Sequence, residues 1–226
     1  MKLIKFLSWT GISSRSQTKK LLKSWYISLN EDYIIYDENH ILQEWDTLNI
    51  IDIKVQVMFE VGVVLHKPMW YLCGRKSEWW HKSIFDLLQD CIYKDTLFVA
   101  GRLDQDTEWL VYLHSDGGMI HNITSPKKNK EKKYLVHISK SLSQQDIDDL
   151  QNGVELDDGY ITLSSKVEII WPKIIKLTIT EGKFHQIKRM LESINNEVIY
   201  LKRLKIGKIS LWDLEISKRR YQNRIS

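Results

Sequence analysis

Short β-prone runs recur along the second half of the chain, and helical segments interrupt them at irregular intervals. A parallel α/β sheet needs a regular alternation of strand and helix, and that alternation is absent here. The pattern therefore predicts an α+β fold with a mixed, largely antiparallel sheet. Strands are expected at 61–65, 98–100, 110–113, 134–138, 167–170, 174–180 and 198–201, and helices at 82–88, 144–151 and 185–194.

The first 55 residues form a predicted module of their own. Residues 2–8 and 16–23 have the periodicity of two short helices, and the serines around residue 14 are candidate N-caps for the second. Two strands are expected after them, at 26–29 and 47–50. We expect a small domain at 1–55, near the lower size limit for independent folding, and a second domain at 57–226.

Basic residues gather in three places, although the net charge is only +4. The first 25 residues hold six basic residues and no acid, residues 127–133 hold five lysines and one glutamate, and the segment from 183 to the end holds eleven basic and four acidic residues. Solvated protein surface explains any one such cluster. Three of them together favour a protein that binds nucleic acid.

One carboxylate stands out in the stretch from 101 to 117, GRLDQDTEWLVYLHSDG. The apolar run 109–113 predicts a strand, so Asp104 lies in a polar loop that leads into it, two residues after Arg102. A carboxylate beside a cation is a candidate catalytic group that is kept ionised. From this stretch alone, a loop aspartate that hydrogen-bonds to its own backbone is the better-supported interpretation.

Two further stretches carry polar chemistry. In EGKFHQIKRM, residues 181–190, a glycine precedes a basic helix start, which leaves backbone N–H groups and cations available to an anion. Lys188 lies one helical turn beyond His185, so both side chains can face one place. Tyr134 opens a predicted strand beside a lysine run, where its ring could stack on a base or pack in the core.

The remaining composition limits the classes of site. Cys73 and Cys91 form no CxxC pair, and the histidines lack ligand spacing, so neither disulfides nor a metal site is expected. The N-terminal residues do not form a signal peptide, and no apolar run has transmembrane length. We expect a soluble, cytoplasmic protein that does not bind membranes.

Together the motifs resemble the Rsu branch of the ribosomal RNA pseudouridine synthases. The likeness rests on Lys67-Pro68, on GRLDxDT at 101–107, on EKKY at 131–134 and on EGKFHQIKRM at 181–190, in the order of that family. The basic N-terminal module is similar to an S4 RNA-binding domain, with KFL, SSRS and ISLN in matching places. The resemblance covers nearly the whole chain.

The resemblance implies roles for individual residues. Asp104 matches the catalytic aspartate, Tyr134 the tyrosine that packs against the target base, and Lys188 the basic residue that pairs with the aspartate. Arg102 matches an RNA-contacting arginine, and the reaction needs no cofactor and no metal. RNA contacts are also expected from Arg15, Lys19, Lys20, Lys127, Lys128, Lys183, His185 and Arg189.

The resemblance favours a uridine of 16S rRNA as the target, because residues 123–136 and 152–156 are more similar to the 16S-modifying enzyme than to its 23S-modifying relatives. Two alternatives stay open: a uridine of 23S rRNA, and a catalytically inactive RNA-binding factor in ribosome assembly. The substrate is free rRNA or an assembly intermediate, and nothing in the sequence requires more than a monomer.

Nine tryptophans and ten glycines in 226 residues are an unusual combination. Trp25, Trp45, Trp70 and Trp109 stand where the family pattern has glycine, at a helix end, in turns and after the loop of Asp104. One explanation is added aromatic rings for RNA stacking. The other is that these codons mean glycine in the source, with Trp79 or Trp80 and Trp212 completing the set and Trp171 a genuine aromatic residue.

Overall fold

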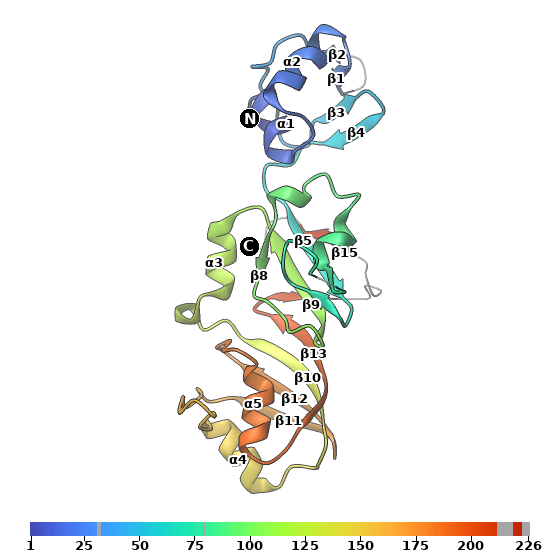
Figure 1. The fold of residues 1–226 in the computed structure, drawn as a ribbon. Helices are drawn as coiled ribbons and strands as arrows, with labels where there is room; N and C mark the ends of the chain where they lie inside the picture. Colours follow the sequence, from blue (N-terminus) through green and yellow to red (C-terminus); the bar gives the residue numbers. More distant parts are fainter. Residues whose placement is uncertain (31–32, 79, 212–218, 223–226) are drawn as a thin grey trace. The chain divides into compact units, whose positions relative to one another are not determined.

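The computed structural model describes residues 1–30, 33–78, 80–211 and 219–222 of the chain. These residues form two compact units (Figure 1). The first unit consists of Met1–Val61 with two later segments, Leu88–Phe98 and His114–Asp116, and the second unit contains the rest.

The first unit has two helices and a four-stranded sheet of order β2-β1-β3-β4, in which all three pairings are antiparallel. The predicted helices are present as α1 (Leu3–Thr10) and α2 (Arg15–Lys23). Ser14 caps α2 in a reciprocal capping box with Gln17, which satisfies two backbone N–H groups at the helix start. The strands are β1 (Ile27–Leu29), β2 (Tyr33–Ile34), β3 (Thr47–Ile50) and β4 (Ile53–Gln56), and a 3-10 turn, η2 (Lys94–Thr96), lies against α1.

The second unit is built on a nine-stranded sheet whose central order is β11-β12-β10-β13-β9-β5-β15. β10 pairs antiparallel with both β12 and β13, while β13 and β9 pair in parallel. The predicted α+β fold with a mixed sheet is therefore confirmed. The strands are β5 (Gly62–Lys67), β8 (Phe98–Ala100), β9 (Glu108–His114), β10 (Lys132–Ile138), β11 (Lys166–Trp171), β12 (Ile174–Ile179), β13 (Val198–Ile206), β14 (Ile209–Ser210) and β15 (Arg219–Gln222).

Three elements differ from the prediction. The segment 82–88, predicted as a helix, is a short strand β7 (Lys82–Ser83), paired with β6 (Tyr71–Leu72), followed by a 3-10 helix η1 (Ile84–Leu88). The side chain of Asp86 accepts a hydrogen bond from the Ser83 backbone N–H at 2.8 Å, which tightens this turn. No helix was predicted between residues 113 and 134, but α3 (Gly117–Thr124) forms there and packs apolar side chains on the core.

The remaining helices are α4 (Gln144–Asn152) and α5 (Gln186–Ser193), both close to their predicted limits, and η3 (Pro126–Lys128). β13 runs to Ile206, five residues beyond the predicted end, because Leu201, Arg203 and Ile206 are all buried along it. Within the described part of the chain, no helix is long and apolar enough to cross a membrane.

Candidate active site

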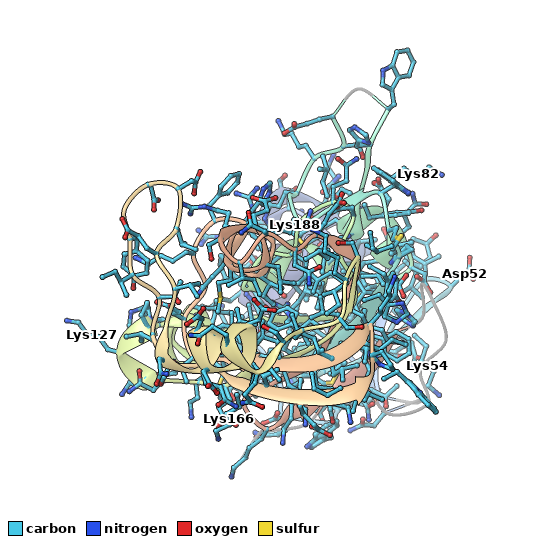
Figure 2. All side chains as sticks on the ribbon, turned by 90° about the horizontal axis from the view of Figure 1, so that it is seen from below. Asp52, Lys54, Lys82, Lys127, Lys166 and Lys188 are labelled. Carbon is cyan, nitrogen blue, oxygen red and sulfur yellow. The ribbon has the colours of Figure 1, made fainter. Side chains whose placement is uncertain are left out.

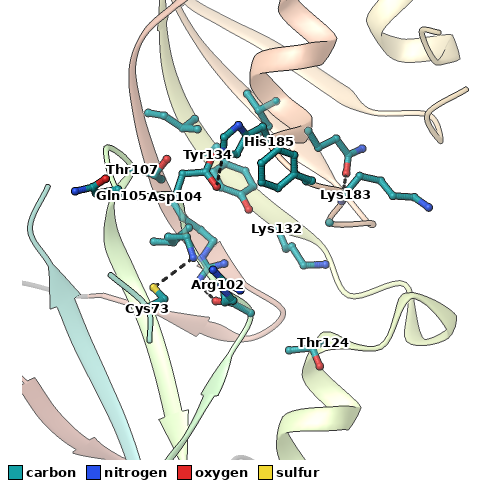
Figure 3. A pocket seen from close by; sticks show the side chains of 18 of the residues that line it. Cys73, Arg102, Asp104, Gln105, Thr107, Thr124, Lys132, Tyr134, Lys183 and His185 are labelled. Atoms are coloured by element: carbon teal, nitrogen blue, oxygen red, sulfur yellow. Dashed lines mark hydrogen bonds and ion pairs between the residues drawn. The ribbon is translucent and has the colours of Figure 1, made fainter. Parts of the chain in front are cut away.

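The loop that joins β8 to β9 lines a cavity of about 600 Å³ in the second unit. Arg102 and Asp104 contribute from this loop, Tyr134 from β10, and residues 182–187 from the start of α5 (Figure 3). Three segments that are far apart in the sequence therefore converge on one cavity.

The buried ammonium of Lys67 fixes the loop from behind. Its Nζ donates hydrogen bonds to the carbonyl oxygens of Pro68 (3.1 Å), Gln105 (2.9 Å) and Thr107 (2.7 Å). Burial lowers the pKa of Lys67 from 10.5 to about 8, although nearby carboxylates act in the opposite direction. An ammonium has three donors, so this geometry uses all of them on backbone.

Arg203 of β13 is the second buried cation behind the loop. Its Nη2 donates to the carbonyl oxygens of Leu110 (2.9 Å) and Gly101 (3.1 Å), and its Nε also donates to Leu110 (3.0 Å). Gly101 opens the loop with a φ of 74°, a conformation that glycine adopts without strain. The start of the loop is thus tied to β9 and β13 by a single side chain.

The start of α5 is arranged by a buried carboxylate, Glu181. It accepts hydrogen bonds from the Tyr160 hydroxyl (2.7 Å), the Leu163 N–H (2.9 Å) and the Gln186 side-chain amide (2.5 Å). Gln186 in turn accepts a bond from the Lys183 N–H at 2.9 Å. These bonds hold the 182–185 turn in a fixed shape at the cavity wall.

Asp104 faces two groups from α5 and the turn before it. The distance from its carboxylate to His185 Nε2 is 3.5 Å (Figure 3). The distance from its carboxylate to Lys188 Nζ is 4.0 Å. The carboxylate of Asp106 lies closer to the same lysine, with oxygens 2.6 Å and 2.8 Å from Lys188 Nζ. Lys188 therefore lies between two carboxylates of one loop and binds Asp106 directly.

Tyr134 forms a buried wall of the cavity. Only 8% of its surface is exposed, and burial raises the pKa of its hydroxyl, an effect that the neighbouring Arg203 guanidinium partly offsets. The hydroxyl therefore stays protonated at neutral pH. Next to this wall, the exposed ring of Phe184 stacks on His185, with ring centroids 3.8 Å apart.

A family model described as "RNA pseudouridylate synthase" matches residues 61–193 of the chain, more than half of its length. The chain belongs to this family. The match includes the loop of Asp104, Tyr134 and Lys188, so most of the cavity described above is lined by matched residues.

Known relatives match the synthase over almost its whole length. It is 34% identical over 215 residues to an uncharacterised RNA pseudouridine synthase of Bacillus subtilis, with 93% of this chain and 90% of the relative covered. It is 32% identical over 214 residues to the ribosomal small subunit pseudouridine synthase A of Yersinia pestis, with 94% and 90% covered. A crystal structure of a pseudouridylate synthase superposes with a TM-score of 0.69 at 29% identity, covering 99% of this chain and 96% of that one.

The structure brings most of the predicted catalytic-domain residues together. Besides Asp104 and Tyr134, the cavity of the synthase is lined by Arg102, Lys183 and His185. Arg189 does not line it, because its guanidinium is paired with the carboxylates of Asp157 and Asp158.

The remaining predicted RNA contacts are exposed. Lys127 and Lys128 lie in η3, beside the cavity-lining Pro126, and Lys127 projects outward from the ribbon (Figure 2). Arg15, Lys19 and Lys20 are exposed on α2 of the first unit, where Lys19 forms an ion pair with Glu38 at 3.4 Å.

Sequence reasoning missed three cations that the synthase uses at this site. Lys67 was noted in a motif without a role, Arg203 lay beyond the predicted end of its strand, and Lys132 was counted in a basic run and in the EKKY motif without a role. Lys132 is buried, lines the cavity and has its pKa lowered by burial. Lys132 and Tyr134 are two residues apart on β10 and therefore share one face of the sheet, which was the available signal. Among the described residues, no group of three or more His, Cys, Asp or Glu side chains could hold a metal ion.

Proposed function

We propose that this synthase converts a specific uridine of small-subunit (16S) ribosomal RNA to pseudouridine, with Asp104 as the catalytic carboxylate. The observation that supports the role most strongly is the position of Asp104, which lies in a cavity between a buried tyrosine and two basic side chains. A carboxylate beside cations stays ionised, as a nucleophile or base must.

The reaction breaks the C1′–N1 bond of the uridine, turns the base, and forms a C1′–C5 bond. The C5 proton is lost and N1 gains a proton, so the isomerisation needs no co-reactant. An ionised Asp104 can add to the sugar or the base, stabilise an oxocarbenium-like centre, or remove a sugar proton. In each case the base is expected to stack on the Tyr134 ring after leaving the RNA stack.

Lys188 is proposed to keep the field at Asp104 positive. Lys188 Nζ is 4.0 Å from Asp104 and is held by Asp106, which makes Asp106 the residue that positions the lysine. His185 is proposed to contact RNA, because it is partly exposed and stacked on Phe184 at the cavity.

The ribosomal substrate is supported by the relatives and by the exposed cations. Relatives at 32% identity over more than nine-tenths of this chain are named ribosomal small subunit pseudouridine synthase A. We propose that the first unit is an S4-like RNA-binding domain, because α2 exposes Arg15, Lys19 and Lys20 along a short basic helix. Such contacts to phosphates position RNA without reading its sequence.

An assay of the purified synthase on 16S and 23S rRNA fragments tests this proposal, with pseudouridine mapped by sequencing. One modified uridine in the 16S fragment, missing from 16S rRNA of a strain that lacks the gene, is the expected result. A site in 23S rRNA alone would reject the 16S assignment. Binding without any pseudouridine, on naked rRNA and on assembly intermediates alike, would reject the enzymatic role in favour of an assembly factor.

A further inference from the structure

Four tryptophans have a left-handed backbone conformation that large L-residues rarely adopt. Their φ angles are 60° at Trp25, 74° at Trp45, 67° at Trp70 and 89° at Trp109. A positive φ brings Cβ against the neighbouring carbonyl oxygen, and only glycine avoids this cost. Among the described residues, nine non-glycine residues have a positive φ; four are these tryptophans, and the others are Asn30, Ile51, Asn129, His185 and Asn195.

Trp25 occupies the position after a helix at which glycine is most favoured. The Tyr26 N–H donates to the Leu21 carbonyl (3.2 Å) and the Trp25 N–H donates to the Leu22 carbonyl (3.3 Å), with Ser24 as the C-cap. This pair of bonds is the Schellman motif, with Trp25 as the left-handed residue. The indole is 64% exposed, so it adds little packing that could offset the strain.

Trp45 and Trp70 lie in turns. The Asp46 N–H donates to the Gln43 carbonyl at 3.4 Å, and Trp45 is the third residue of this turn, where a positive φ defines type II and selects glycine. Trp70 is the last of the three residues that connect β5 and β6, and its N–H donates to the Gln105 carbonyl in the active-site loop at 2.8 Å. The side chains of Trp45 and Trp70 are 50% and 62% exposed.

Trp109 is the second residue of β9, two residues after the active-site loop ends. Its indole lies under the Lys202 ammonium, 3.2 Å from the ring centroid, and against the His66 ring, 4.1 Å away. Burial lowers the pKa of Lys202. Glycine at position 109 would adopt the positive φ without strain, and the absence of a ring would relieve the crowding around Lys202.

Other tryptophans of the same chain provide a comparison. Trp9 has no positive φ, lies within α1 and packs on Phe6 and Tyr93. Trp171 ends β11, next to a register shift at Ile169, and also has no positive φ. Trp79 and Trp212 lie outside the described residues. The unusual backbone is therefore a property of particular positions and not of tryptophan in this protein.

We infer that the protein made in its source carries glycine at positions 25, 45, 70 and 109, because the four codons are read there as glycine. The composition agrees, since ten glycines in 226 residues fall below the ordinary usage of about 7%. RNA stacking by added rings accounts poorly for the four sites, because it requires no left-handed backbone and neither Trp70 nor Trp109 lines the cavity.

Mass spectrometry of the protein isolated from its source tests this directly. Trypsin yields residues 24–54, which contain positions 25 and 45, residues 55–75, which contain position 70, and residues 103–127, which contain position 109. Each is expected at the mass for glycine, while residues 6–15 and 167–173 keep tryptophan at 9 and 171. Tryptophan in the first three peptides would overturn the inference.

Recombinant variants test the physical basis separately. Glycine at all four positions is expected to raise the thermal midpoint by roughly 5 °C or more relative to the printed sequence. Alanine at the same positions should recover less, because it removes the ring but keeps Cβ at a positive φ. The control Trp9→Gly should lower the midpoint. Equal gains from alanine and glycine would contradict the backbone argument.

Discussion

Two cations on the buried side of the loop 101–107 bind backbone carbonyls, whereas a lysine and a histidine on its open side face carboxylates. Lys67 and Arg203 together contact four carbonyl groups in or beside the loop, and Lys67 also contacts the carbonyl of Pro68, just after β5. Lys188 and His185 lie within ion-pair distance of Asp104 or Asp106. The buried cations fix the shape of the loop, and Lys188 acts on the charge of its carboxylates. Substitutions on the two sides should therefore have different effects.

The largest effect is expected at the carboxylate itself. Asp104→Asn keeps the size of the side chain and removes its charge, so pseudouridine formation should fall by roughly 10⁴-fold or more while RNA binding persists. Release of tritium from RNA labelled at uridine C5 measures the first quantity, and a filter-binding assay measures the second. Normal turnover by this variant would remove Asp104 from the mechanism.

A substitution on the buried side should reduce stability as well as activity. Lys67→Met leaves three carbonyls without their donor, and the free energy of unfolding should fall by about 3 kcal/mol, measured by urea denaturation. The matched control is Lys82→Met, which removes an exposed lysine of the same unit and should change stability by less than about 0.5 kcal/mol. Equal stability of the two variants would show that the carbonyl contacts do not hold the loop.

On the open side the effect should appear in turnover and not in stability. Lys188→Met should lower kcat by about 10²-fold with little change in KM. The reason is that the Lys188 ammonium acts on the Asp104 carboxylate in the reaction and must be held close to it. Asp106→Asn removes only a partly exposed ion pair with Lys188, so we expect kcat to fall by less than about tenfold. Lys188→Arg should restore part of the activity. A larger loss from Asp106→Asn than from Lys188→Met would reverse the assigned roles.

The buried side also carries a dependence on pH. The folded pKa of Lys67 is about 8, below the unfolded value of 10.5, so between these values the unfolded chain binds one more proton than the folded chain. Stability from this group therefore rises with pH in that window. The unfolding free energy of the wild type, relative to Lys67→Met, should increase by about 2 kcal/mol between pH 8 and 10. A flat difference would show that Lys67 has an ordinary pKa.

The smallest effect is expected far from the loop, on the basic helix of the first unit. Alanine at Arg15, Lys19 and Lys20 should weaken rRNA binding by about tenfold. The slope of log K for RNA binding against log salt concentration should become shallower by about 2. The kcat at saturating RNA should not change. Lys54→Ala on β4 is a control for a single exposed lysine. A change in kcat would mean that this helix does more than hold RNA.

The sequence was sufficient to predict what depends on local pattern. Both N-terminal helices, α5 and the loop that carries Asp104 follow from hydrophobic periodicity, a serine cap and polar residues between two strands. The structure also places His185 and Lys188 next to that loop, as their spacing on the helix suggested.

The contacts behind the loop could not be predicted in the same way. Lys67 and Arg203 bind backbone carbonyls, and every residue has a carbonyl. The partners of these two cations therefore have no characteristic residue type that could be recognised in the sequence. Lys188 Nζ likewise lies about 1.4 Å closer to the carboxylate of Asp106 than to that of Asp104, a difference set by the placement of the side chains. No spacing rule distinguishes two aspartates on one loop.

The use of Arg203 behind the loop has a consequence for the order of biosynthesis. The loop is complete by residue 107, yet the guanidinium that ties Gly101 to Leu110 enters the chain almost a hundred residues later. A nascent chain on the ribosome therefore carries Asp104 long before the site can take its final shape. Catalytic competence begins only when the last long strand, β13, has been synthesised and has joined the sheet.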